Sequence, residues 1–256
     1  MERRHPLGPG GAGARRLLLL VPLLVAGCGF TRNSAAPPPP AATTAATTAV
    51  RAAPKHVGES IVATAIARDV PIYRTPNARR PFLHLSNPTG VREPLTFLVR
   101  ERRAGWERVY LPIRPDGSTG WTRDRYLRLA WNPYSVHVRM RAHQLVLMKR
   151  SRVVARFPAA VGRSVLPTPK GRYYIVDLLK QPDPNGLYGP FAFGLSAYSH
   201  VLYSFGGGPG QIGIHGTNEP DSIGRSASHG CIRLRNEDIV RLAHTLPLGT
   251  PVTIGG

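Results

Sequence analysis

The feature that most limits how this chain can fold is a succession of short apolar runs that never settle into a helical repeat. IVATAIA, VPIY and PLTFLVRE are separated by turn residues, and SVHVRM and QLVLMK continue the pattern after residue 134. Apolar runs of about four to eight residues between turns are typical of strands. One convincing helical pattern spans Asn236–Thr245, where Asn236 is expected to cap the helix. The sequence therefore predicts a mostly β protein with one short C-terminal helix.

Two β-rich domains are expected, at residues 57–133 and 134–256. In the first, the pairing of GWERVYLP with GSTGW resembles the small Src-homology-like β-barrels of bacterial envelope proteins. Such a barrel implies either a module that binds the cell wall or a folded spacer that binds nothing, and the sequence leaves both open. Trp106 and Trp121 are expected to pack in its core rather than to hold a ligand.

The first 28 residues have the pattern of an export signal. Arginines precede an apolar run at residues 17–26, which is too short to span a bilayer comfortably. The run ends at VAGC, which resembles the lipobox of bacterial lipoproteins, in which the cysteine, here Cys28, is acylated. The alternative is a plain signal peptide with a chance cysteine. Residues 29–56 contain PPPPAATTAATTAV and are expected to be a disordered tether, because they offer little apolar surface to bury.

Charge narrows the range of partners. The chain has 34 Lys and Arg against 14 Asp and Glu, a formal net charge of +20, and the excess is spread along its whole length. Such a spread suits an anionic envelope, whereas nucleic-acid binders more often gather basic residues on one element. Together with the export signal and the lipobox resemblance, this spread of charge leads us to expect an exported protein. It would be lipid-anchored to the outer face of the cytoplasmic membrane and would have no nucleic-acid partner.

Cys231 is the second of only two cysteines, so its role has to be decided among nucleophile, metal ligand and inert buried thiol. If Cys28 is acylated, Cys231 has no partner for a disulfide within the chain. Zinc is a poor explanation, because His215, His229 and Cys231 lack the paired spacing of local zinc ligands. The sequence predicts no metal site.

A nucleophilic cysteine needs access, a base, and donors for the oxyanion that forms when it attacks a carbonyl. His215 lies in the apolar segment QIGIHG and can face Cys231 from a neighbouring strand. The N–H groups of Gly230 and Cys231 are the expected oxyanion donors. The helix that begins shortly after Cys231 is expected to lower the pKa of its thiol.

The residues around this cysteine match a known signature. HGT at 215–217 and SHGCIR at 228–233 resemble the motif of the L,D-transpeptidase catalytic domain of bacterial peptidoglycan metabolism. TPKGRYYI, SFGGGPGQIGIHGT and GTPVTI also fall where that family places them. The loop between the two motifs is short, and Arg233 stands where cross-linking members often have Asn, which leaves the choice of acceptor open.

The resemblance implies a role for each residue of the motif. Cys231 would be the nucleophile and His215 the group that accepts and returns its proton. A hydrogen bond from His215 to a backbone carbonyl, for which Gly216 is the candidate, would fix the tautomer. Gly230 would support the oxyanion site through its backbone. A carbapenem would be expected to acylate Cys231.

The other motif residues concern substrate. Arg233 would hold a carboxylate of the stem peptide. His229 would shape the oxyanion site through its backbone while its ring packs and hydrogen-bonds, and Ser228 would orient the loop or meet the substrate.

Taken together, the resemblance implies a monomeric L,D-transpeptidase that needs no metal or cofactor. It would form 3→3 cross-links between peptidoglycan stem peptides through a cysteinyl thioester. An L,D-carboxypeptidase, in which water resolves the same thioester, and a non-catalytic wall-binding lipoprotein are the alternatives. A papain-like peptidase is disfavoured, because there the cysteine precedes the histidine in the chain. The diamino acid of the stem is left open.

Overall fold

A computed structural model describes residues 56–205 and 207–256. The predicted signal segment with Cys28 and nearly all of the predicted tether lie outside these residues. Within the described ranges, no helix is long and apolar enough to cross a membrane.

The first sheet is antiparallel and has the strand order β6-β5-β4-β1-β7. Its strands are β1 (Ser60–Ala65), β4 (Thr96–Arg103), β5 (Trp106–Tyr110), β6 (Thr119–Arg123) and β7 (Leu127–Asn132). A two-stranded pair, β2 (Asp69–Ile72) with β3 (Leu83–Ser86), and a 3₁₀ turn, η1 (Asp124–Tyr126), complete this region.

Trp106 and Trp121, two of the three tryptophans of the first sheet, are buried, as the sequence predicts; the third, Trp131 on β7, is exposed. Trp106 and Trp121 are 3% and 4% exposed. The guanidinium of Arg123 lies 3.9 Å from the centre of the Trp106 ring, and Arg103 lies 4.8 Å from that of Trp121. Arginines therefore cover the indole faces of Trp106 and Trp121. The likeness to Src-homology barrels stays a prediction.

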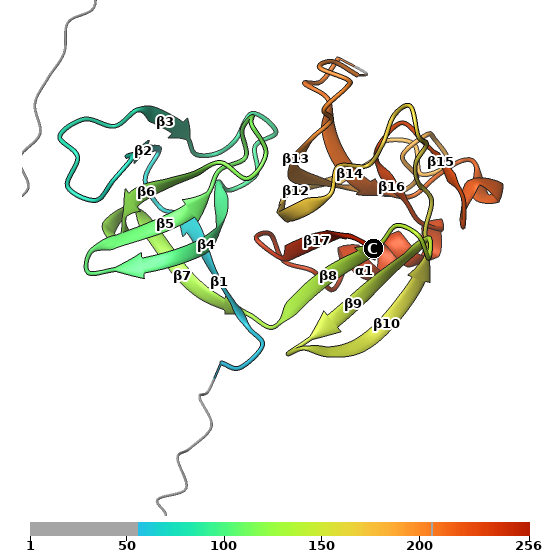
Figure 1. Ribbon diagram of the computed structural model, residues 1–256, viewed down its shortest axis with the longest axis horizontal. Helices are drawn as coiled ribbons and strands as arrows, with labels where there is room; N and C mark the ends of the chain where they lie inside the picture. The colour runs from blue at the N-terminus through green and yellow to red at the C-terminus, as the bar shows by residue number, and fades with distance from the viewer. Residues whose placement is uncertain (1–55, 206) are drawn as a thin grey trace, which may run out of the picture. The chain divides into compact units, whose positions relative to one another are not determined.

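The second sheet has eight strands in the order β10-β9-β8-β17-β12-β13-β14-β16 (Figure 1). The strands before β14 are β8 (Tyr134–Arg139), β9 (Gln144–Lys149), β10 (Arg152–Pro158), β12 (Gly171–Lys180) and β13 (Phe191–Tyr198). The later strands are β14 (Gln211–His215), β16 (Ile232–Arg233) and β17 (Pro251–Gly255). A separate parallel pair joins β11 (Val161–Gly162) to β15 (Ser226–Ser228), and a 3₁₀ turn, η2 (Pro220–Ser222), precedes β15.

Parallel pairing at one edge of the second sheet assembles the motif residues. β14 pairs in parallel with β16, so that His215 and Arg233 are register partners. β13 pairs with the other side of β14 in antiparallel fashion. The core beneath includes Phe193, Ile214 and Ile232, all 0% exposed, which fixes the strands that carry the polar groups. The mostly β fold with a single α-helix is confirmed for the described residues.

The helix is shorter than predicted and is capped differently. α1 spans Asn236–Ala243 and packs against β13 and β14. Glu237 and Asp238 lie in its first turn, where their negative charges interact favourably with the helix dipole. Asn236 was expected to be its cap, which is wrong: the N-cap residue is Arg235, with no side-chain cap. Asn236 Oδ1 instead accepts the Thr217 N–H at 2.8 Å, and so ties the helix to the segment after His215.

Candidate active site

A tight loop between β15 and β16 presents the cysteine. The Ser228 hydroxyl donates to the Cys231 carbonyl at 2.5 Å and accepts the Gly230 N–H at 3.1 Å. Gly230 has a φ of +121°, a conformation that side chains with a Cβ rarely adopt. The loop aims the Cys231 side chain at β14, where the Gly213 N–H donates to Sγ at 3.3 Å. Because hydrogen bonds within the loop hold its backbone, the thiol is positioned independently of any substrate.

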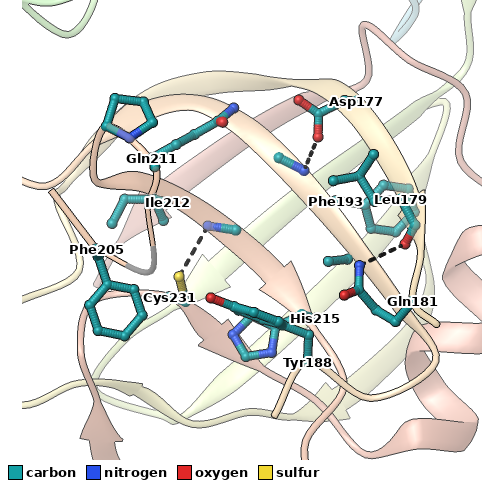
Figure 2. A pocket seen from close by; sticks show the side chains of 15 residues that line it. Asp177, Leu179, Gln181, Tyr188, Phe193, Phe205, Gln211, Ile212, His215 and Cys231 are labelled. Atoms are coloured by element: carbon teal, nitrogen blue, oxygen red, sulfur yellow. Dashed lines mark hydrogen bonds between the residues drawn. The ribbon is translucent and has the colours of Figure 1, made fainter. Parts of the chain in front are cut away.

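His215 ends β14 and has a fixed tautomer. Its Nδ1 lies 2.6 Å from the Gly216 carbonyl oxygen, which can only accept, so Nδ1 carries the proton. In the neutral ring, Nε2 is then left with its lone pair. The expected bond to Gly216 is therefore present, and no carboxylate is needed to orient the ring. His215 and Cys231 line the same pocket, and Figure 2 shows their side chains at the same end of it.

Burial sets the resting protonation of this pair. The pKa of His215 is lowered to about 4, mainly by desolvation; the hydrogen bond to the Gly216 carbonyl opposes this shift, and the Arg233 charge adds to it. Burial raises the pKa of the Cys231 thiol, and the Gly213 N–H and Arg233 only partly offset this. At neutral pH the site therefore holds a neutral imidazole and a protonated thiol.

The expected lowering of the thiol pKa by the helix is wrong. Strand β16 and two further residues separate Cys231 from the start of α1 at Asn236, and the effect of a helix dipole fades within about one turn of its end. Burial is the larger effect. The thiol consequently depends on a neighbouring base to become a nucleophile.

The pocket that Cys231 and His215 share has a volume of about 270 Å³. The Tyr188 ring meets the His215 ring edge-on, with centroids 4.9 Å apart. Phe205 lines the pocket and stacks on the His229 ring, with centroids 5.5 Å apart. Sequence reasoning missed Tyr188, because it lies in a turn-rich segment with no periodic pattern.

Arg233 lines an adjoining pocket with Cys231 and Glu219. Its side chain is 6% exposed, and Nη1 donates to Glu219 Oε2 at 2.5 Å, while the Glu219 side chain is 59% exposed. The sequence did not identify Glu219 as its partner. A solvent-exposed carboxylate can be displaced more easily than a buried one, so Arg233 can exchange it for a carboxylate of a ligand.

The remaining motif residues support the loop. The Ser228 hydroxyl is engaged with backbone atoms of the loop on both sides, which gives it a structural role; a contact with substrate stays a prediction. The His229 side chain is exposed and packs on Phe205, in line with the expectation that its ring only packs. The Gly230 N–H is already bound to Ser228, so it is not the free oxyanion donor that was expected. Cys231 N–H has no acceptor among residues 56–205 and 207–256 and can serve as that donor.

Metal ligands are not gathered here. In the part of the chain that the structure describes, no group of three or more His, Cys, Asp or Glu side chains converges on a common point. The Nδ1 of His215 is committed to a carbonyl. The thiol and the neutral imidazole together can support the attack of sulfur on an electrophilic carbon.

Comparison with known proteins agrees with this geometry. The family model of the YkuD L,D-transpeptidase catalytic domain matches residues 133–254. The Bacillus licheniformis protein named as an L,D-transpeptidase, YkuD, is 39% identical over 122 residues, which cover 48% of this chain and 66% of the relative. Bacillus subtilis YqjB, named likewise, is 31% identical over 137 residues, covering 49% of this chain and 73% of the relative. The chain thus spans slightly less than two thirds of the length of YkuD.

Among solved structures, an L,D-transpeptidase from Mycobacterium smegmatis superimposes with a TM-score of 0.40 at 18% identity. The match covers 61% of this chain and 80% of that protein. A likeness at this level adds no weight to a functional assignment.

Proposed function

This chain belongs to the L,D-transpeptidase catalytic-domain family, and we propose that it cross-links peptidoglycan stem peptides through a cysteinyl thioester. The observation that carries the proposal is the pairing of a thiol with a single-tautomer, neutral histidine in one pocket. A base with a free Nε2 and an S–H nucleophile are the two groups that acyl transfer requires.

In the acylation step, His215 Nε2 takes the thiol proton as Cys231 Sγ attacks the carbonyl of the L-centre of the diamino acid in a donor tetrapeptide. The carbonyl oxygen gains negative charge, which the Cys231 N–H stabilises. When the C–N bond breaks, His215 gives the proton to the departing amine, and D-alanine leaves. Sγ is then bonded to the acyl group as a thioester, and His215 is neutral again.

In the second step, the amine of a neighbouring stem attacks the thioester. His215 Nε2 accepts a proton from the attacking nitrogen and returns it to sulfur as the C–S bond breaks. The product is a 3→3 cross-link, the enzyme recovers its thiol, and no metal or cofactor takes part. Arg233 contributes by binding the carboxylate of the terminal D-alanine in place of Glu219, since a guanidinium can pair with a carboxylate through two hydrogen bonds.

The proposed setting follows from the sequence outside the described residues. Acylation of Cys28 would anchor a monomeric enzyme to the outer face of the cytoplasmic membrane, and the net charge of +20 favours an anionic wall. Metabolic labelling with a fatty-acid analogue tests the anchor: wild type should incorporate label, and equal incorporation in Cys28→Ala would rule out this attachment.

Incubation of the protein with purified tetrapeptide muropeptides, followed by mass spectrometry of the products, tests the activity. We expect D-alanine and a dimer linked through two diamino acids. Tripeptide alone would instead identify an L,D-carboxypeptidase, because water would then be the acceptor. Unchanged substrate with correctly folded protein would overturn the enzymatic assignment.

A further inference from the structure

A buried carboxylate lies in the pocket that holds the nucleophile, and the proposed reaction does not use it. Asp177, on β12, is 8% exposed and lines the pocket together with Cys231. No Lys, Arg or His nitrogen of the described residues lies within 4.0 Å of it to form an ion pair. Its carboxylate accepts the Gly194 N–H on Oδ1 at 3.0 Å, while the side-chain amide of neighbouring Gln211 donates to the Leu195 carbonyl at 2.9 Å. Burial without a cation raises the pKa of this carboxyl group.

The strand register places Asp177 and the nucleophile at two ends of one row. Asp177 on β12 pairs with Gly194 on β13, and Gly194 pairs with Gly213 on β14. The Gly213 N–H in turn donates to Cys231 Sγ. Neighbouring strands lie about 5 Å apart, so the row spans roughly 10 Å between Asp177 and Gly213. Figure 2 shows Asp177 and Cys231 at opposite ends of the pocket.

Two glycines in this row, Gly194 and Gly213, place no side chains between Asp177 and Cys231. A Cβ on Gly194 would lie 2.7 Å from Asp177 Oδ2, which no real Cβ tolerates, so the carboxylate can fold over the strand only because residue 194 has no side chain. Gly213, its register partner, likewise places no side chain between Asp177 and Cys231. The result is a trough across β13 and β14 with a thiol at one end and a carboxylate at the other.

We propose that Asp177 determines substrate specificity by binding the side-chain amine of the donor diamino acid. This inference rests on the proposed function. The amine of a diamino acid with a four-carbon side chain lies roughly 7 Å from the carbonyl carbon that Cys231 attacks, when the chain is extended. Adding a hydrogen bond of about 3 Å gives a length of about 10 Å, which matches the span of the row between Asp177 and Gly213. The acceptor amine is excluded as the occupant, because it must attack at the thioester itself.

Charge complementarity supports the same orientation. Arg233 lines the adjoining pocket that also includes Cys231 and His215, so the nucleophile shares one pocket with an anion and the next with a cation. A donor residue that presents the D-alanine carboxylate on one side of the scissile bond and an ammonium on the other matches both charges. A carboxylate buried without a cation is the group that gains most from an ammonium ligand.

The test compares two donors that differ only at this amine. Tetrapeptide muropeptide with a free side-chain amine and the same donor N-acetylated there are each supplied with an excess of unmodified tripeptide acceptor, and D-alanine release is measured. We expect wild type to prefer the free amine by about tenfold to a hundredfold. In Asp177→Asn the preference should fall towards one, while Asp183→Asn, an exposed acid in the loop after β12, should retain the wild-type ratio.

The possible outcomes separate this inference from the proposed function. Asn at position 177 can still accept the Gly194 N–H, so a purely structural Asp177 would leave the preference unchanged in the variant, and that result would overturn the inference. Equal use of both donors by wild type would also overturn it. Failure of wild type to release D-alanine from either donor would instead contradict the transpeptidase proposal itself.

Discussion

The two sheets bury ionisable groups in different ways. In the first sheet, the Glu107 side chain is 2% exposed, and Arg102 Nε donates to both of its oxygens at 2.9 and 3.1 Å. In and beside the second sheet, Arg233 is paired with Glu219, but backbone N–H and C=O groups, rather than a salt bridge, hold His215, Cys231 and Asp177. A buried group that already has a fixed cation is part of the fold, whereas one held by backbone dipoles can still accept a proton or a ligand. All three of the latter groups line one pocket.

The largest effect is expected from removing the thiol and the imidazole, the two groups that are proposed to exchange a proton. Cys231→Ser and His215→Ala should each lower D-alanine release by at least about a thousandfold, and the double variant should be hardly worse than either, because the groups act as a unit. A carbapenem should add one drug mass to wild type and none to Cys231→Ser in intact-protein mass spectrometry. A double variant that loses the product of the two single effects would show that the residues act separately.

The next largest effect is expected in the pH dependence of turnover. His215 must be neutral to accept the thiol proton, and its pKa is about 4, so turnover should fall only below about pH 4 instead of below 6.5. At pH 5 the enzyme should therefore keep most of its rate, about thirtyfold more than an ordinary histidine would allow. An acid limb centred near pH 6.5 would contradict the burial argument.

The same pKa makes a statement about stability. The pKa of His215 is lower in the folded than in the unfolded state, so on acidification the unfolded state protonates this histidine first. The contribution of neutral His215 to the free energy of unfolding is fully present above about pH 6.5. It is lost as the pH falls towards 4, by an amount on the order of 3 kcal/mol. Urea unfolding of wild type and His215→Ala across this range measures it as the part of the pH dependence that the variant lacks.

The smallest effect is expected in the first sheet. Glu107→Gln should lower the free energy of unfolding by about 1 kcal/mol, because the charge-assisted pair is lost while half-exposed Arg102 is still solvated. Turnover should not change. Asp177→Asn should show the reverse pattern, with unfolding unchanged and donor preference altered, and a large loss of stability there would place Asp177 with Glu107 as a structural group.

Local sequence is sufficient to predict the strands and to single out His215 and Cys231, which line one pocket. Short apolar runs predict strands wherever one face is buried, and the HGT and SHGC motifs place His215 and Cys231 next to residues that serve them locally. The bond from His215 to Gly216 joins sequence neighbours, so it too could be anticipated.

What the sequence could not reveal depends on contacts between distant segments. Asn236 has the pattern of a helix cap, yet its side-chain oxygen accepts the Thr217 N–H. This contact depends on how α1 packs on β14. The sequence does not single out Asp177, because the register of β12, β13 and β14 that aligns it with Cys231 is set by pairing across loops. The thiol pKa was predicted with the wrong sign, since burial is a property of the assembled core.

Keeping the Cys231 thiol protonated at rest also has a consequence for oxidation chemistry. Peroxide oxidation and disulfide exchange both proceed through the thiolate. A buried thiol with a raised pKa offers little of that form, and Ser228 and Gly230 hold its loop in place. The raised pKa, which under the proposed mechanism makes Cys231 depend on His215, would therefore also slow its oxidation between turnovers, so that its reactivity is confined largely to a bound electrophile.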